Sequence, residues 1–124
     1  MNDHEAAHDD LKQLWDALPD DVRDECDCEY SPVRDVWWME FGYVITDIIS
    51  RRKVCALLCH AAEEWLLSKC EKYQLSFHEL DSPEWDVIFR VYSPNGTARN
   101  KCVTGHSKVE VLAAAVKAVR EGER

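Results

Sequence analysis

The sequence predicts an α+β fold, in which a small antiparallel sheet of two to three strands packs against helices. Three observations predict it: a strand-like alternation over residues 85–92, a helix-start motif at Ser107, and an apolar helical stripe that begins after Val54. In chain order they give an α-β-β-β-α core over residues 54–124. An acidic, mainly helical part over residues 1–53 precedes this core.

The acidic part predicts two helices. Residues 3–18 carry apolar side chains at helical spacing, and Pro19 then ends this helix and stands near the first position of a short acidic helix over residues 20–25. Residues 26–32 are expected to be a connection. The apolar stripe of the first helix consists of Leu11, Leu14, Trp15 and Leu18.

Residues 33–50 fit two secondary structures. The middle of this range is dense in aromatic and β-branched side chains, which favours a strand. The spacing of Trp37, Phe41 and Val44 also fits one side of a helix, and residues 47–53 continue that stripe. We expect a helix here, with the aromatic side chains packed in the core.

The core begins with a long helix and continues with strands. Residues 54–73 contain neither Gly nor Pro and present a broad apolar face, so they predict a helix. Residues 75–80 and 85–92 predict two strands, because aromatic and β-branched residues alternate with polar ones. Residues 98–103 predict a third strand.

A turn and a closing helix complete the core. Residues 93–96 predict the turn, because Asn and Gly accept positive φ values at little cost. Ser107 and Glu110 fit a capping box, in which each side chain bonds a free amide at the start of a helix. The apolar stripe of this helix consists of Val109, Leu112, Ala113 and Val116.

Negative charge is concentrated near the start of the chain. The protein has 24 acidic and 15 basic residues, a formal net charge of −9, and residues 3–29 hold 11 of the acidic and 2 of the basic residues. Such a segment repels nucleic acid and attracts a basic protein surface. The partner-binding residues predicted from this charge are Asp20, Asp21, Asp24, Glu25, Asp27 and Glu29.

No sequence motif predicts catalysis. The chain contains no glycine-rich phosphate loop, no G-x-S-x-G nucleophile elbow and no H-E-x-x-H zinc motif. We expect the many carboxylates of residues 3–29 to be exposed to solvent, whereas a catalytic acid needs a distinct, desolvated environment. We therefore expect a protein that is not an enzyme and uses no cofactor.

The six cysteines predict thiols in or near the core. The C-x-C motif at 26–28 and the C-x₃-C-H motif at 55–60 differ in spacing from zinc fingers, so we expect no metal site. Cys55, Cys59 and Cys70 fall along one line of the predicted helix, as small apolar side chains do. An acidic N-terminus and the lack of a long apolar stretch predict a cytoplasmic protein with reduced thiols and no membrane span.

Residues 54–121 resemble the double-stranded RNA-binding domain, which has the same α-β-β-β-α order. Ser82-Pro83, the strand through Phe89, and Gly105-His-Ser-Lys108 before an alanine-rich helix are similar to the second half of that domain. The family has a basic cluster at this helix start, but here Lys108 is followed by an apolar and an acidic residue. The resemblance therefore implies one phosphate contact, at Lys108, without the cluster that supplies most of the binding energy.

The same region also resembles small bacteriophage proteins that have an α-β sandwich domain and no assigned activity. The similarity rests on Trp85-Asp-Val-Ile-Phe89 in the central strand and on Ala113-Ala-Ala115 in the closing helix. It implies an origin in a phage or another mobile element.

Three functional hypotheses follow. In the leading one, a non-enzymatic phage-type protein binds and inhibits a nucleic-acid-handling host protein in the host cytosol, through its acidic surface, as inhibitors of the anti-CRISPR or anti-defence type do. The first alternative is a double-stranded-RNA-binding-like module with phosphate contacts at Arg99, Lys101 and Lys108, although the acidic charge disfavours a nucleic-acid partner. The second is a phage structural protein that forms a homo-oligomer through residues 37–43.

Overall fold

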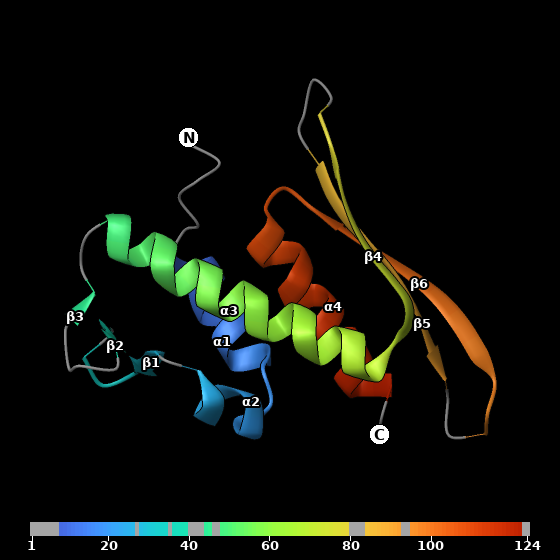
Figure 1. Cartoon of the computed structure of the whole chain (residues 1–124), viewed down its shortest axis with the longest axis horizontal. Coiled ribbons are helices and arrows are strands. Elements are labelled where there is room, and N and C mark those ends of the chain that lie inside the picture. The colour runs from blue at the N-terminus through green and yellow to red at the C-terminus, as the bar shows by residue number, and fades with distance from the viewer. Residues whose placement is uncertain are drawn as a thin grey trace.

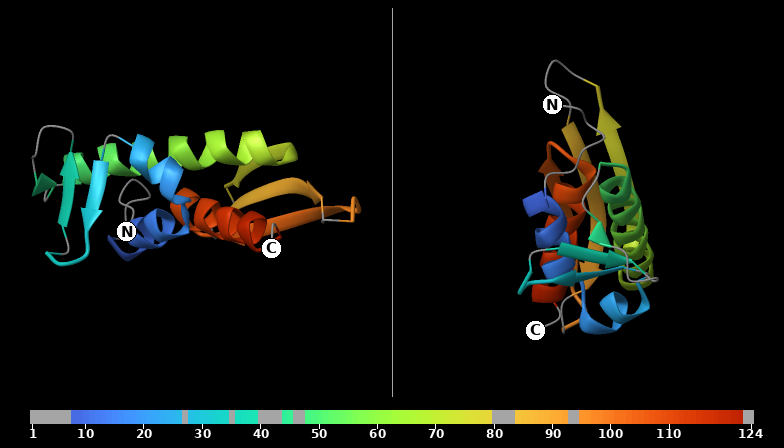
Figure 2. Two further views of the ribbon diagram at one scale, coloured as in Figure 1. Left: turned by 90° about the horizontal axis from the view of Figure 1, so that it is seen from below. Right: turned by 90° about the vertical axis from the view of Figure 1, so that its left-hand side faces the viewer.

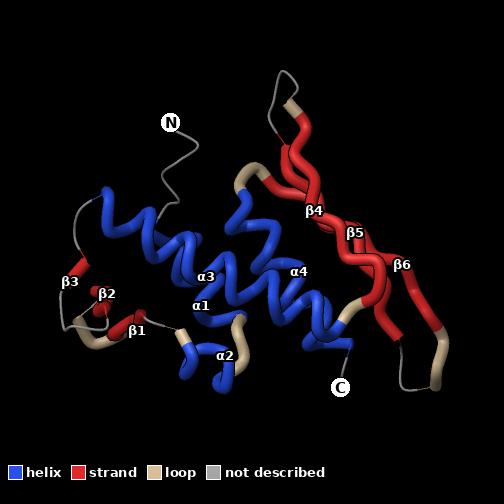
Figure 3. The backbone as a smooth tube through the Cα atoms, in the orientation of Figure 1, coloured by secondary structure: helices blue, strands red, loops and turns tan. Residues whose placement is uncertain are grey.

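Helices occupy the middle of the molecule, and two sheets lie at its opposite ends (Figures 1 and 3). The computed structural model of the 124-residue chain describes residues 8–26, 28–34, 36–39, 44–45, 48–79, 84–92 and 95–122. Both sheets are antiparallel and have three strands each. The α+β class that the sequence predicts is therefore confirmed.

The predicted α-β-β-β-α order of the core is also confirmed, with shifted boundaries. The core consists of α3 (Ile48–Lys69), β4 (Glu71–His78), β5 (Glu84–Tyr92), β6 (Ala98–Gly105) and α4 (Lys108–Gly122). Its strands pair in the order β4-β5-β6. α4 lies against β5 and β6, and α3 contacts both α4 and β4. The two helices therefore cover one side of this sheet (Figure 2).

The first core helix ends earlier than predicted. It ends at Lys69 rather than at Tyr73. In the strand that follows, Lys72 has a φ of 55°, in the left-handed region, and the pairing of β4 with β5 shifts register between Glu71 and Gln74. Tyr73 therefore belongs to β4, whose first residues are irregular, and not to the helix.

The alternation predicted for the central strand is confirmed. Val87 and Phe89 on β5 are buried against the helices, and Trp85 and Val91 pack at the border of the same core. Ile88, which points to the opposite face, is exposed. The side of the sheet away from the helices is therefore the solvent side.

The helix start forms as predicted, and so does the described half of the turn, whereas residues 93–94 of the predicted turn lie outside the described residues. Gly96, between β5 and β6, has a φ of 86°, which a residue with a side chain rarely adopts. The main-chain N–H of Glu110 donates to the Ser107 hydroxyl at 3.1 Å, and the Glu110 carboxylate accepts from the N–H of His106 at 3.2 Å. The capping box thus satisfies two main-chain amides at the start of α4.

The acidic part contributes two helices, α1 (His8–Ala17) and α2 (Asp20–Glu25). α1 packs against both α3 and α4, and residues 3–7 of the predicted first helix lie outside the described residues. The position between residues 53 and 54, where we divided the sequence, lies inside α3. The predicted stripe of α1 is fully or almost fully buried: Leu11, Leu14, Trp15 and Leu18.

The segment between α2 and α3 is where the sequence prediction was wrong. β1 (Cys28–Ser31) lies in the predicted connection, and β2 (Val36–Met39) and β3 (Val44–Ile45) lie within the helix expected over residues 33–50. Of that expected helix, residues 48–50 are helical, and residues 35, 40–43 and 46–47 lie outside the described residues. Aromatic and β-branched side chains gain more from cross-strand pairs than from a helix, and β2 pairs along its length with β1. The helical spacing in this segment was therefore misleading.

Trp37 fixes this small sheet to the helices. Its side chain is 1% exposed, and its ring packs edge-on against Trp15 of α1, with 5.7 Å between ring centroids. The ring centroids of Tyr30, on β1, and Trp37 are 5.0 Å apart. The expected core role of Trp37 is confirmed, so Trp37 is not part of an exposed patch for self-association. Residues 40–43 lie outside the described residues.

Candidate protein-binding site

Helix α2 presents most of the acidic residues that the sequence predicts to bind a partner. It begins after Pro19, and none of its six residues is buried. Asp20 and Asp21 lie in its first turn, where carboxylates interact favourably with the helix dipole. Asp24 and Glu25 in its second half are exposed as well. The helix is therefore a short, solvent-facing element that carries negative charge along its length.

The acidic side chains of α2 divide between two hollows. Asp21 and Glu25 line a pocket against α3, whereas Asp20 and Asp24 line a groove against α1 and β1. Glu29 on β1 belongs to the groove. Asp27 lies outside the described residues. The structure thus places five of the predicted residues on α2 and the neighbouring β1, but not in one site.

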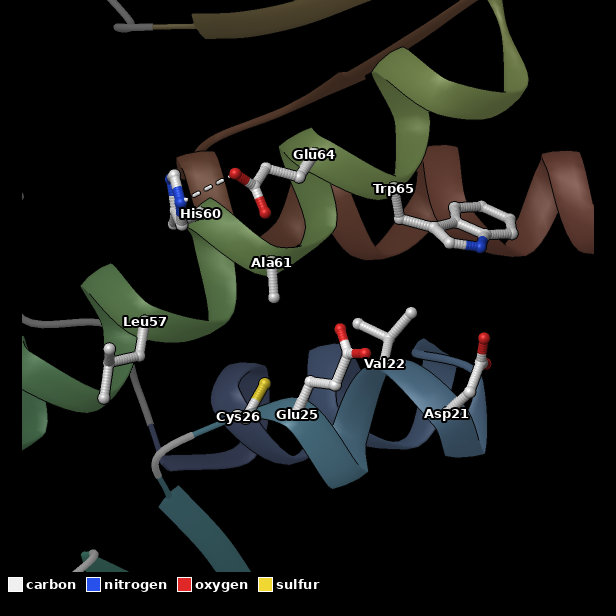
Figure 4. Close-up of a pocket in the computed structure, with 9 residues that line it drawn as sticks. All are labelled: Asp21, Val22, Glu25, Cys26, Leu57, His60, Ala61, Glu64 and Trp65. Atoms are coloured by element: carbon white, nitrogen blue, oxygen red, sulfur yellow. Dashed lines mark ion pairs between the residues drawn. The ribbon is translucent and has the colours of Figure 1, made fainter.

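The pocket between α2 and α3 has a volume of about 370 Å³ and is amphipathic. In Figure 4, Val22 and Glu25 point from α2 toward α3, while Leu57 and Ala61 point from α3 toward α2. The ring of Trp65 extends along one end of the pocket, on the same side as Asp21. The residues that line it are Asp21, Val22, Glu25, Cys26, Leu57, His60, Ala61, Glu64 and Trp65.

The pocket carries negative charge without a matching cation. Of the described residues, three carboxylates line it, on Asp21, Glu25 and Glu64, and no Lys or Arg does. His60 pairs with Glu64 through Nε2 at 3.1 Å, and both side chains are mostly exposed. Within the described part of the chain, Asp21 and Glu25 have no ion pair. A cationic group in the pocket would therefore meet unpaired carboxylates beside apolar walls.

The groove on the other side of α2 is larger, about 890 Å³, and its charges are partly balanced. Arg23 forms an ion pair with Asp20, and its guanidinium lies 5.7 Å from the ring centroid of Trp15. The ammonium of Lys12 lies 5.4 Å from the ring centroid of Tyr30. Two cations are thus already in place among the acidic residues of the groove.

A pair of thiols on α3 is the other reactive feature of the described residues. The Sγ atoms of Cys55 and Cys59 lie 3.9 Å apart. The hydrogen bond from Cys59 lowers the pKa of Cys55 below its ordinary value, against the effect of burial, and the positive charge of Lys108 contributes in the same direction. The same hydrogen bond, together with burial, raises the pKa of Cys59. His60, next in sequence to Cys59, pairs with Glu64.

The cations of the RNA-binding alternative come from two elements, β6 and α4. Arg99 and Lys101 are on β6, where they pair with Val91 and Phe89 of β5. Lys108, at the start of α4, lies 3.6 Å from the carboxylate of Glu63. The one residue that the domain resemblance assigns to phosphate contact is thus already paired with an acid.

Comparison with known proteins does not assign the chain to a family. No family model, curated protein or solved structure matches it. Among the described residues, no three His, Cys, Asp or Glu side chains are grouped so as to hold a metal ion. No helix in that part of the chain is long and apolar enough to cross a membrane.

The pocket residues on α3 were not predicted from the sequence. Leu57 and Ala61 belong to the apolar stripe of a long helix, and such a stripe predicts core packing. In the structure both side chains are only partly buried, because the short α2 does not cover them completely. The breadth of the stripe is the signal that would have indicated an incompletely covered helix face.

Proposed function

We propose that the protein is a non-enzymatic, phage-type inhibitor that binds a basic, nucleic-acid-binding surface of another protein through the acidic surface around α2. One observation carries the proposal: the short helix α2 exposes four carboxylates, and two of them line a pocket that has apolar walls and no Lys or Arg among its described lining residues. A surface of this kind is complementary to the Lys and Arg side chains that contact phosphates. By covering those side chains, the protein would compete with nucleic acid.

The test is affinity capture from a bacterial lysate, with and without nuclease, compared between the native protein and the double variant Asp24→Lys, Glu29→Lys. Both residues are exposed and lie outside the pocket. We expect the native protein to retain a nucleic-acid-handling protein after nuclease treatment, and the variant to lose it. The matched control is Glu79→Lys, Glu121→Lys, which changes the net charge equally at exposed positions elsewhere.

Two results would contradict the proposal. If the double variant captures the same protein as the native chain, the acidic surface is not the binding surface. If capture is lost on nuclease treatment, and a mobility shift with duplex RNA appears at low salt, the chain binds nucleic acid itself. Light scattering with an unchanged mass would show that neither double variant has altered the oligomeric state.

A further inference from the structure

We infer that the pocket between α2 and α3 accepts a single arginine side chain of the partner. The inference rests on the proposed function, because it names the group through which a basic partner would be anchored. Three features support it: the shape of the pocket, its unpaired carboxylates, and a complete cluster of the same kind on the opposite side of α2.

The dimensions and walls of the pocket suit a long side chain with an apolar stem. A volume of about 370 Å³ is room for one such side chain rather than for a peptide segment. Val22, Leu57 and Ala61 form walls on both sides, against which the three methylene groups of an arginine can pack. A charged head group would then reach the carboxylates at the pocket's border.

The neighbouring groove contains a complete cluster of a cation, an aromatic ring and a carboxylate. There, the guanidinium of Arg23 lies over the ring of Trp15 and pairs with the carboxylate of Asp20. This combines a cation–π contact with a charge-assisted hydrogen bond. On the pocket side of the same helix, a tryptophan and acidic residues are again side by side, but the cation is absent from the lining.

In the pocket, Trp65 takes the place of the aromatic ring, and Asp21 and Glu25 take the place of the carboxylate. Figure 4 shows the carboxylates of Asp21 and Glu25 pointing from α2 toward the helix that carries Trp65. An incoming guanidinium would complete this cluster as Arg23 completes the other one. Arginine is favoured over lysine, because its planar head group can stack on a ring and bind a carboxylate through two N–H groups at once.

The experiment is a titration of the isotope-labelled full chain with the capped tripeptide Gly-Arg-Gly, followed by NMR. The reporter is the indole N–H signal of Trp65, assigned by its absence in Trp65→Phe. We expect this signal to shift and saturate with the arginine peptide, and to shift several-fold less with Gly-Lys-Gly. A peptide with norleucine at the central position should leave it unchanged.

Two variants test whether the peptide binds in the pocket. Glu25→Gln removes a carboxylate without changing the size of the side chain, and should weaken binding of the arginine peptide about tenfold. Ala61→Leu fills the pocket without changing charge, and should abolish the shift. Glu79→Gln, at an exposed site outside the pocket, is the control and should bind as the native chain does. A spectrum with native dispersion confirms that each variant is folded.

The inference is overturned if the Trp65 signal does not respond to the arginine peptide, or if Glu25→Gln binds it as tightly as the native chain. Either result would leave the proposed function standing, provided that protein capture still depends on Asp24 and Glu29. If capture does not depend on these residues but the peptide binds as expected, the proposed function fails and the arginine pocket remains.

Discussion

The guanidinium of Arg120 on α4 donates a hydrogen bond from Nη1 to the main-chain carbonyl of Ala17, at 2.7 Å. The two residues are 103 positions apart, and Ala17 is the last residue of α1. This bond satisfies one of the free carbonyls at the end of that helix. It ties the acidic part of the chain to the last helix of the core, directly before the segment that leads to α2.

Replacement of Arg120 by Met should therefore weaken the docking of α1. The apolar stem is kept, but a partly buried carbonyl loses a charged donor, so we expect the free energy of unfolding to fall by about 1–2 kcal/mol. Urea denaturation followed by tryptophan fluorescence measures it. Lys117→Met, at an exposed position of the same helix, should change stability by less than about 0.5 kcal/mol. Equal effects of the two replacements would show that the Arg120 bond has no role.

The cap of α4 gives a second prediction. Ser107→Ala removes the oxygen that accepts the N–H of Glu110, so it should cost about 1 kcal/mol of stability. Ser107→Asp supplies another acceptor at the same place and should restore most of the loss. Thermal denaturation of the three proteins would measure this order. If the Ser107→Ala and Ser107→Asp variants were equally stable, the cap would not contribute to the stability of the protein.

The thiol pair predicts a pH-dependent reactivity. Because the hydrogen bond from Cys59 lowers the pKa of Cys55, alkylation of Cys55 by iodoacetamide should reach half its maximal rate below the ordinary thiol value of 9.0. Cys59→Ala removes the donor and should move that midpoint to higher pH, whereas Cys59→Ser keeps a donor and should move it less. Mass spectrometry of the labelled peptide follows the rate. A midpoint that is the same in all three proteins would contradict the account of this pair.

Local signals predicted the core well. The alternation along β5 survives because Val87 and Phe89 face the helices, and the Ser107–Glu110 box marks the start of α4 to within one residue. Both signals depend only on neighbours in the sequence. The end of α3 was missed because no Gly or Pro follows Lys69 to mark it.

The β1–β2–β3 sheet and the pocket could not be predicted in this way. Trp37 fits either a strand or a helix when only its neighbours are considered, and its partners Trp15 and Tyr30 come from elsewhere in the chain. The acidic residues were found by charge alone. Charge does not reveal that α2 rests against α3, so the sequence could not show that Glu25 shares a pocket with Trp65.

On the proposed function, the acidic surface around α2 competes with nucleic acid for a basic surface of the partner. The most direct measurement is displacement of a fluorescent oligonucleotide from the captured partner, read by anisotropy as the protein is added. We expect the native chain to release the oligonucleotide, more effectively at low salt than at high salt, and the Asp24→Lys, Glu29→Lys variant to fail. If the native chain binds the partner while the oligonucleotide stays in place, or if the variant displaces it equally well, the claim is contradicted.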